Sequence, residues 1–99
     1  MLPYPIIKNT VIVGRKPALN YVMACLTFFN DGASTVTLRA RGQAISHAID
    51  TVELLRRAFI KDLEIKKISI GTEELTRPEG FKTNVSTIAI DFSKPSKAK

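Results

Sequence analysis

The alternation of hydrophobic and polar residues along the chain predicts six structural elements. A β-branched run at residues 10–14 closes with Gly14, as is typical of a buried strand. Pro17 suits the first turn of a helix, and apolar residues then recur at helical spacing up to the stop signal Asn30-Asp31-Gly32. The predicted core stripe of this helix contains Leu19, Val22, Met23, Leu26 and Phe29. Residues 35–41 alternate strictly, which predicts a half-buried strand.

The second half of the chain predicts one helix and two long strands. A helix of about 17 residues is expected from Gln43 to Phe59. Its predicted stripe contains Ile45, Ala48, Ile49, Val52, Leu55 and Phe59. Residues 63–76 and 82–92 have the composition of strands. In the first of these the apolar positions change from odd to even numbers, which predicts a β-bulge near Lys66-Lys67.

The order β-α-β-α-β-β favours a two-layer α/β sandwich, in which a mixed four-stranded sheet is covered by two helices. Residues 10–92 form this predicted domain, with a lead-in at 1–9 and a polar, basic tail at 93–99. The last two strands are longer than two short helices can cover. We therefore expect their turn, residues 77–82, to project from the domain as a hairpin.

Composition narrows the classes of protein that fit. The chain has 99 residues, and 15 Lys and Arg against nine Asp and Glu give a net charge of +6, which makes it a candidate for binding polyanions. There is no apolar run long enough for a membrane span and no pattern of a signal peptide, so we expect a cytosolic protein. One cysteine, Cys25, and one histidine, His47, are poor material for a metal site, and neither metal nor cofactor is expected. Cys25 is expected to be a buried structural thiol.

The sequence contains no group of side chains that is arranged as a catalytic site. Ser46, His47 and Asp50 are close in sequence, but helix neighbours point about 100° apart, which prevents the serine from reaching the histidine ring. Glu73 and Glu74 are expected on opposite faces of a strand. The segment from Gly14 has the position of a phosphate-binding loop but lacks its motif spacing. The sequence therefore predicts a protein that is not an enzyme.

Four cations, by contrast, are expected to converge. Arg15 and Lys16 lie between the first strand and the first helix, a position that favours anions. Arg39 and Arg41 project from the polar face of the second strand. Because a parallel β-α-β unit brings both strand ends to one edge, all four should gather there. Polar neighbours expected at the same edge are Asn20, Tyr21 and Gln43.

Five short motifs occur along the chain in the order of the predicted elements. They are Val13-Gly14-Arg15-Lys16-Pro17, Asn20-Tyr21-Val22, Arg39-Ala40-Arg41-Gly42-Gln43-Ala44-Ile45-Ser46, Ile70-Gly71-Thr72-Glu73 and Asn84-Val85-Ser86-Thr87-Ile88. In these motifs the chain resembles the Alba family of small archaeal chromatin proteins, and the resemblance extends from about residue 10 to residue 92. It implies the Alba fold and a homodimer that coats double-stranded DNA without marked sequence preference, on the chromosome in the cytoplasm. Members of the family also bind RNA.

The resemblance also implies roles for particular residues. The implied DNA contacts are Arg15, Lys16, Asn20, Tyr21, Arg39, Arg41, Gln43 and His47, together with Arg77 and Lys82 at a hairpin tip that reaches the minor groove. Lys16 occupies the position at which acetylation weakens DNA binding in the family, which implies an acetyltransferase and a deacetylase as partners. Contacts between dimers would involve Phe59, Leu55 and Arg56. The alternative for Phe59, which we favour less, is that it is the last core residue of its helix.

Three positions depart from the family pattern. Arg15 stands where lysine is common, Gln43 where arginine is common, and His47 where lysine often occurs. The loss of two cations per protomer should weaken DNA binding, and it suggests a variant that pairs with a more typical paralogue. Two functions remain open from the sequence: an architectural binder of duplex DNA, and a module that grips structured RNA through its phosphates.

Overall fold

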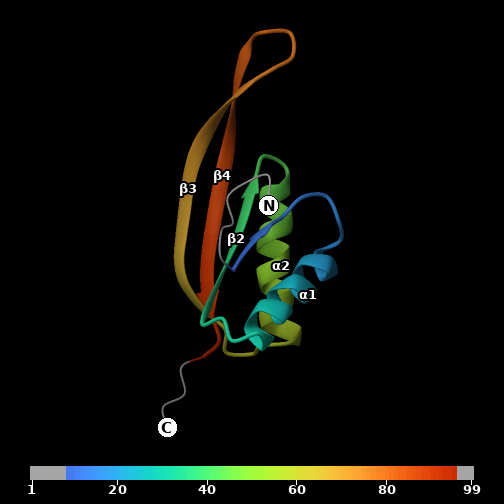
Figure 1. Ribbon diagram of the computed structural model, residues 1–99, viewed down its shortest axis with the longest axis vertical. Coiled ribbons are helices and arrows are strands. Elements are labelled where there is room, and N and C mark those ends of the chain that lie inside the picture. Colours follow the sequence, from blue (N-terminus) through green and yellow to red (C-terminus); the bar gives the residue numbers. More distant parts are fainter. Residues whose placement is uncertain (1–8, 96–99) are drawn as a thin grey trace, which may run out of the picture.

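The computed structural model describes residues 9–95 and has the predicted order of elements (Figure 1). In chain order they are β1 (Thr10–Ile12), α1 (Ala18–Asn30), β2 (Thr35–Arg41), α2 (Ala44–Ala58), β3 (Glu64–Thr76) and β4 (Lys82–Ser93). One layer is a four-stranded sheet and the other consists of the two helices. The predicted two-layer α/β sandwich is confirmed.

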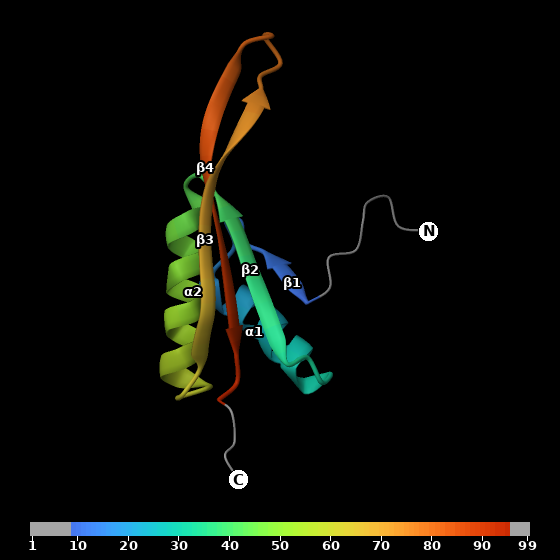
Figure 2. The ribbon, with the colours of Figure 1, turned by 90° about the vertical axis from the view of Figure 1, so that its left-hand side faces the viewer.

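The sheet has the strand order β1-β2-β4-β3. β1 and β2 are parallel, with Val11 opposite Leu38, and the other two pairs are antiparallel. Both helices lie on the same side of the sheet and pack on β1 and β2 (Figures 1 and 2). The other side, which we call the open face, carries the odd-numbered residues of β2, including Arg39 and Arg41.

The predicted boundaries are correct to within two residues. β1 stops at Ile12, although the Val13 amide still donates a hydrogen bond of 2.8 Å to the Arg39 carbonyl. Pro17 precedes α1 instead of lying in its first turn, because its ψ of 148° is not helical. α2 is shorter by one residue at each end, since Gln43 and Phe59 are its caps.

The tail boundary also moves by one residue. Ser93 is the last residue of β4 and is buried, so the predicted basic tail begins after it. Residues 1–8 of the predicted lead-in and residues 96–99 of the predicted tail lie outside the described residues.

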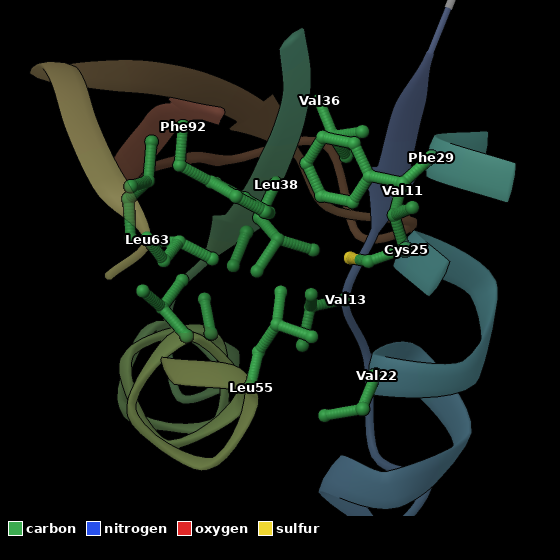
Figure 3. Close-up of a cluster of buried hydrophobic side chains, with 14 residues drawn as sticks. Val11, Val13, Val22, Cys25, Phe29, Val36, Leu38, Leu55, Leu63 and Phe92 are labelled. Carbon is green, nitrogen blue, oxygen red and sulfur yellow. The ribbon is translucent and has the colours of Figure 1, made fainter. Parts of the chain in front are cut away.

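The core lies between the helices and the first three strands of the sheet order (Figure 3). Phe92, Leu38 and Leu55 are its largest fully buried apolar side chains, and the rings of Phe29 and Phe92 meet edge to face with their centroids 6.0 Å apart. Cys25 is fully buried here, and this burial raises the pKa of its thiol to about 12. The expectation of a structural thiol is confirmed, because a thiol with such a pKa carries almost no thiolate at neutral pH.

Four residues assigned to the core stripes are instead about half exposed. Leu19 and Met23 lie on the flank of α1, and Ile49 and Phe59 on the flank and end of α2. A short helix buries only the side that faces the sheet, and helical spacing alone does not show where that side is centred. In α2 the buried side includes Thr51, a residue absent from the predicted stripe, whose hydroxyl donates to the His47 carbonyl at 2.7 Å.

β3 and β4 extend far beyond the rest of the sheet. The predicted bulge is present as a register shift between Ile65 and Lys67. β2 pairs with β4 only from Thr87 to Ser93, so residues 73–85 form a two-stranded hairpin that we call the arm. The arm rises above both helices in Figure 1 and makes the molecule 56 Å long against 32 and 23 Å in the other directions. The projecting hairpin is therefore confirmed.

Candidate nucleic-acid interface

An open hollow of about 1060 Å³ lies where the carboxyl ends of β1 and β2 meet the middle of β3 and β4. It contains three of the four predicted cations, Arg15, Arg39 and Arg41. Gln43 and His47 complete the predicted residues that line it. The parallel β1-α1-β2 unit has brought these side chains together. The predicted convergence therefore holds for three of the four cations, whereas Lys16 does not line the hollow.

The loop that carries Arg15 and Lys16 is fixed by hydrogen bonds to side chains. The Tyr21 hydroxyl accepts one bond from the Gly14 amide at 2.9 Å and another from the Lys16 amide at 3.0 Å. His47 Nδ1 lies 3.0 Å from the Gly14 carbonyl. Because a carbonyl can only accept, this contact requires the proton of the imidazole to be on Nδ1. The loop is thus held from α1 and from α2.

Two of the predicted contact residues also have a structural role. The Tyr21 hydroxyl and Nδ1 of His47 bind the backbone of the loop. They position Arg15 and Lys16, whose side chains are both exposed. Asn20 is the third residue of α1 and is exposed to solvent.

Arg41 has an acidic partner that the sequence analysis missed. Its Nη1 atom lies 2.9 Å from Oε1 of Glu73 on β3, and the two side chains are 59% and 45% exposed. An ion pair this exposed contributes only about 0–1 kcal/mol. A phosphate can therefore replace Glu73 as the partner of Arg41 at little cost. The sequence signal that could have revealed this ion pair is the predicted bulge, because the bulge determines which β3 residues lie on the open face with Arg41.

The cations of the arm form a separate group. Neither Arg77 nor Lys82 lines the hollow, and both are exposed. Lys82 Nζ lies 3.8 Å from a carboxylate oxygen of Glu74. Glu79 is also in the arm, and Glu73 at the base of the arm pairs with Arg41, so the two cations of the arm are balanced by Glu74 and Glu79. The excess of positive charge lies in the hollow and not in the arm.

Two other classes of site were tested on the described residues. Neither α1 nor α2 is long and apolar enough to cross a membrane. Across residues 9–95, no group of three or more His, Cys, Asp or Glu side chains is placed to hold a metal ion.

Comparison with known proteins identifies the family of this chain. The sequence profile of the Alba family matches residues 9–72. The chain is 51% identical over 90 residues to the "DNA/RNA-binding protein Alba" of Methanocella arvoryzae, which covers 91% of this chain and 94% of that protein. The chain belongs to the Alba family. It is also 47% identical over 87 residues to "DNA/RNA-binding protein Alba 1" of Archaeoglobus fulgidus, with 88% of this chain and 97% of that protein covered.

Solved Alba structures share the fold. Alba from Thermoplasma volcanium superposes with a TM-score of 0.81 at 42% identity, covering 87% of this chain and all of that chain. ALBA1 from Trypanosoma brucei gives a TM-score of 0.75 at 26% identity, covering 93% and 74%. The archaeal Alba relatives are named as nucleic-acid-binding proteins and not as enzymes, in agreement with the sequence analysis. The Alba profile ends at residue 72, where the arm of this chain begins.

In this Alba chain, removal of the Tyr21 hydroxyl should loosen the basic loop. We expect Tyr21→Phe to lower the free energy of unfolding by about 1–2 kcal/mol, because two backbone amides lose their acceptor. Amide hydrogen exchange at Gly14 and Lys16 should accelerate, whereas the Val13 amide, which is bonded to β2, should keep its protection. Unchanged exchange at both amides would contradict the role of Tyr21.

Proposed function

We propose that this Alba chain binds double-stranded DNA without marked sequence preference and coats it as dimers. The observation that carries the proposal is the gathering of Arg15, Arg39 and Arg41 in one hollow. Exposed Lys16 lies on the same fixed loop. A charge cluster of this kind attracts phosphates and releases their counterions.

The side chains of the hollow suit backbone contacts better than base reading. Arginine and lysine reach phosphate oxygens in any sequence, whereas specific reading requires an element that enters a groove and presents donors and acceptors to base edges. Here the cations lie on a loop and on a sheet face and not along an exposed recognition helix. A protein of this kind would act as a chromatin protein on the chromosome, with its coverage set by charge.

Structured RNA is the second candidate ligand. The two archaeal relatives are named as binding both DNA and RNA, and the phosphates of an A-form helix offer the same charges to the hollow. Titration of a duplex DNA and of a hairpin RNA of equal length at one salt concentration separates the two. Affinity for DNA at least equal to that for RNA is the expected result.

Dimerisation is supported by a group of exposed isoleucines, which we call the apolar strip. Ile68 and Ile70 of β3 pair with Ile90 and Ile88 of β4, so they share the face that carries the helices. β3 nevertheless lies beyond the helices, which leaves Ile70 82% exposed. Exposed Ile49 and half-buried Ile45 extend the strip onto α2. The same strip on a second copy of the chain, or of a paralogue, would cover it.

A contact between dimers is proposed at the end of α2. Phe59 is 46% exposed and lies outside the core cluster, as an aromatic contact requires. Arg56 is half-buried beside it and pairs with Glu53 at 2.6 Å. Leu55, which was expected to share this contact, is fully buried in the core and cannot reach another dimer.

Binding should depend on salt and on Lys16. The logarithm of the affinity should fall linearly with the logarithm of salt concentration, with a slope of several units. Lys16→Gln, which mimics acetylation, should weaken binding and lower the slope by about one for each lysine removed. Lys61→Gln removes the same charge from the opposite end of α2 and serves as the control. Equal effects of the two variants, or a flat salt response, would refute the proposed site.

A single substitution tests whether the apolar strip is the dimer interface. Ile70→Asp should convert dimers to monomers in sedimentation equilibrium, because two carboxylates would be buried at a two-fold interface. The melting temperature of the monomer should change little, since Ile70 is largely exposed within one chain. Met23→Asp changes an exposed residue of α1 and should leave the dimer intact. A dimer that survives Ile70→Asp would place the interface elsewhere.

Phe59→Ala should separate assembly from DNA contact. We expect weaker cooperativity on long DNA and nearly unchanged affinity of one dimer for a short duplex, because the ring would be covered only by another dimer. Calorimetry and binding to duplexes of increasing length provide the two measurements. A core role would instead lower stability by about 3–5 kcal/mol and leave cooperativity as it was.

A further inference from the structure

The tip of the arm carries an exposed aromatic side chain whose function the basic hollow does not explain. Phe81 lies next to Lys82, the first residue of β4, and is 60% exposed. It is remote from the core cluster, which includes no residue of the arm's turn. A large apolar side chain that lies at a projecting tip, outside the core, is available to a partner.

The turn holds Phe81 in a defined position. The Arg77 amide donates to the Phe81 carbonyl at 2.8 Å, and the Gly80 amide donates to the Arg77 carbonyl at 2.9 Å. Gly80 has a φ of 101°, a conformation that favours glycine, and Pro78 fixes its own φ. These constraints lower the entropy that the tip would lose on binding.

The arm has no net positive charge of its own with which to attract a polyanion. Its two cations, Arg77 and Lys82, are balanced by Glu74 and Glu79, while Glu73 at its base pairs with Arg41. Lys82 is in addition close to Glu74. A contact other than phosphate binding would therefore strengthen the attachment of the arm to nucleic acid, and Phe81 is the exposed large apolar side chain of the arm.

We propose that Phe81 is an apolar wedge that inserts between adjacent base pairs from the minor groove and kinks the duplex. The inference rests on the proposed binding of double-stranded DNA. Proteins that bend DNA from the minor groove use phenylalanine, proline and other apolar side chains in this way, and the unstacking they cause is offset by stacking and by additional contacts. Arg77 and Lys82 would contact the phosphates on either side of the opened step.

The wedge favours B-form DNA over the other partners. The minor groove of A-form RNA is wide and shallow, which leaves an inserted ring poorly enclosed. A protein partner for Phe81 is the alternative, and it predicts a loss of assembly and not a change in the shape of the duplex. Shape and assembly can be measured separately on the same variant.

The experiment measures duplex shape and base stacking on a short DNA that holds one dimer. Donor and acceptor dyes at the two ends report bending by energy transfer, and a set of duplexes with 2-aminopurine at successive pyrimidine–purine steps reports unstacking. The full-length wild type should raise both signals. Phe81→Ala should lose most of both changes, and its affinity should fall by about tenfold or less with an unchanged salt slope.

Two variants provide controls. Phe81→Leu keeps an apolar wedge and should retain most of the bend, and Met23→Ala removes an exposed apolar side chain from α1 and should behave as wild type. Wild-type signals in Phe81→Ala would overturn the inference, as would a straight duplex under saturating wild type. A loss of cooperativity with the bend retained would assign Phe81 to a protein contact instead. Absence of salt-dependent duplex binding by the wild type would refute the proposed function itself.

Discussion

The parallel pairing of β1 with β2 is the constraint on which the rest of the structure depends. It places both strand ends at one edge of the sheet, where Val13 donates to the Arg39 carbonyl and the chain turns into α1. Arg15 therefore reaches the same hollow as Arg41 although 25 residues separate them in sequence. Tyr21 and His47 then fix the loop through hydrogen bonds to its backbone. These bonds hold Arg15 near Arg39 and Arg41 although the three positive charges repel one another.

Most of the fold could be predicted from the sequence because its signals are local. The β-branched run, the strict alternation of residues 35–41 and the change of parity before Ile68 each report the face that a residue occupies. Features that depend on the relative placement of distant elements could not be predicted. Periodicity placed Leu19 and Ile49 in the core, yet only packing on the sheet decides which flank of a helix is covered.

The candidate site shows the same division between local and distant signals. The cations were found because their position at strand ends is a local property. Glu73 was missed because its approach to Arg41 requires the register of β3 on β4 and of β4 on β2. The bonds from Tyr21 and His47 to the loop were missed for a related reason, since both residues were assigned from the family resemblance and their partners depend on the packing of α1 and α2.

The unequal lengths of the two layers expose the two surfaces for which further functions are proposed. β3 and β4 extend past helices of 13 and 15 residues, which leaves Ile70 without cover and lifts the arm clear of the domain. In a protein with strands matched to its helices, both features would be buried or absent. The net charge of +6 then has to be considered by region, because the hollow holds the positive excess and the arm does not. In the proposed mode of binding, long-range attraction to a polyanion and close contact at the arm tip would therefore be carried by different parts of the molecule, the first sensitive to salt and the second nearly independent of it.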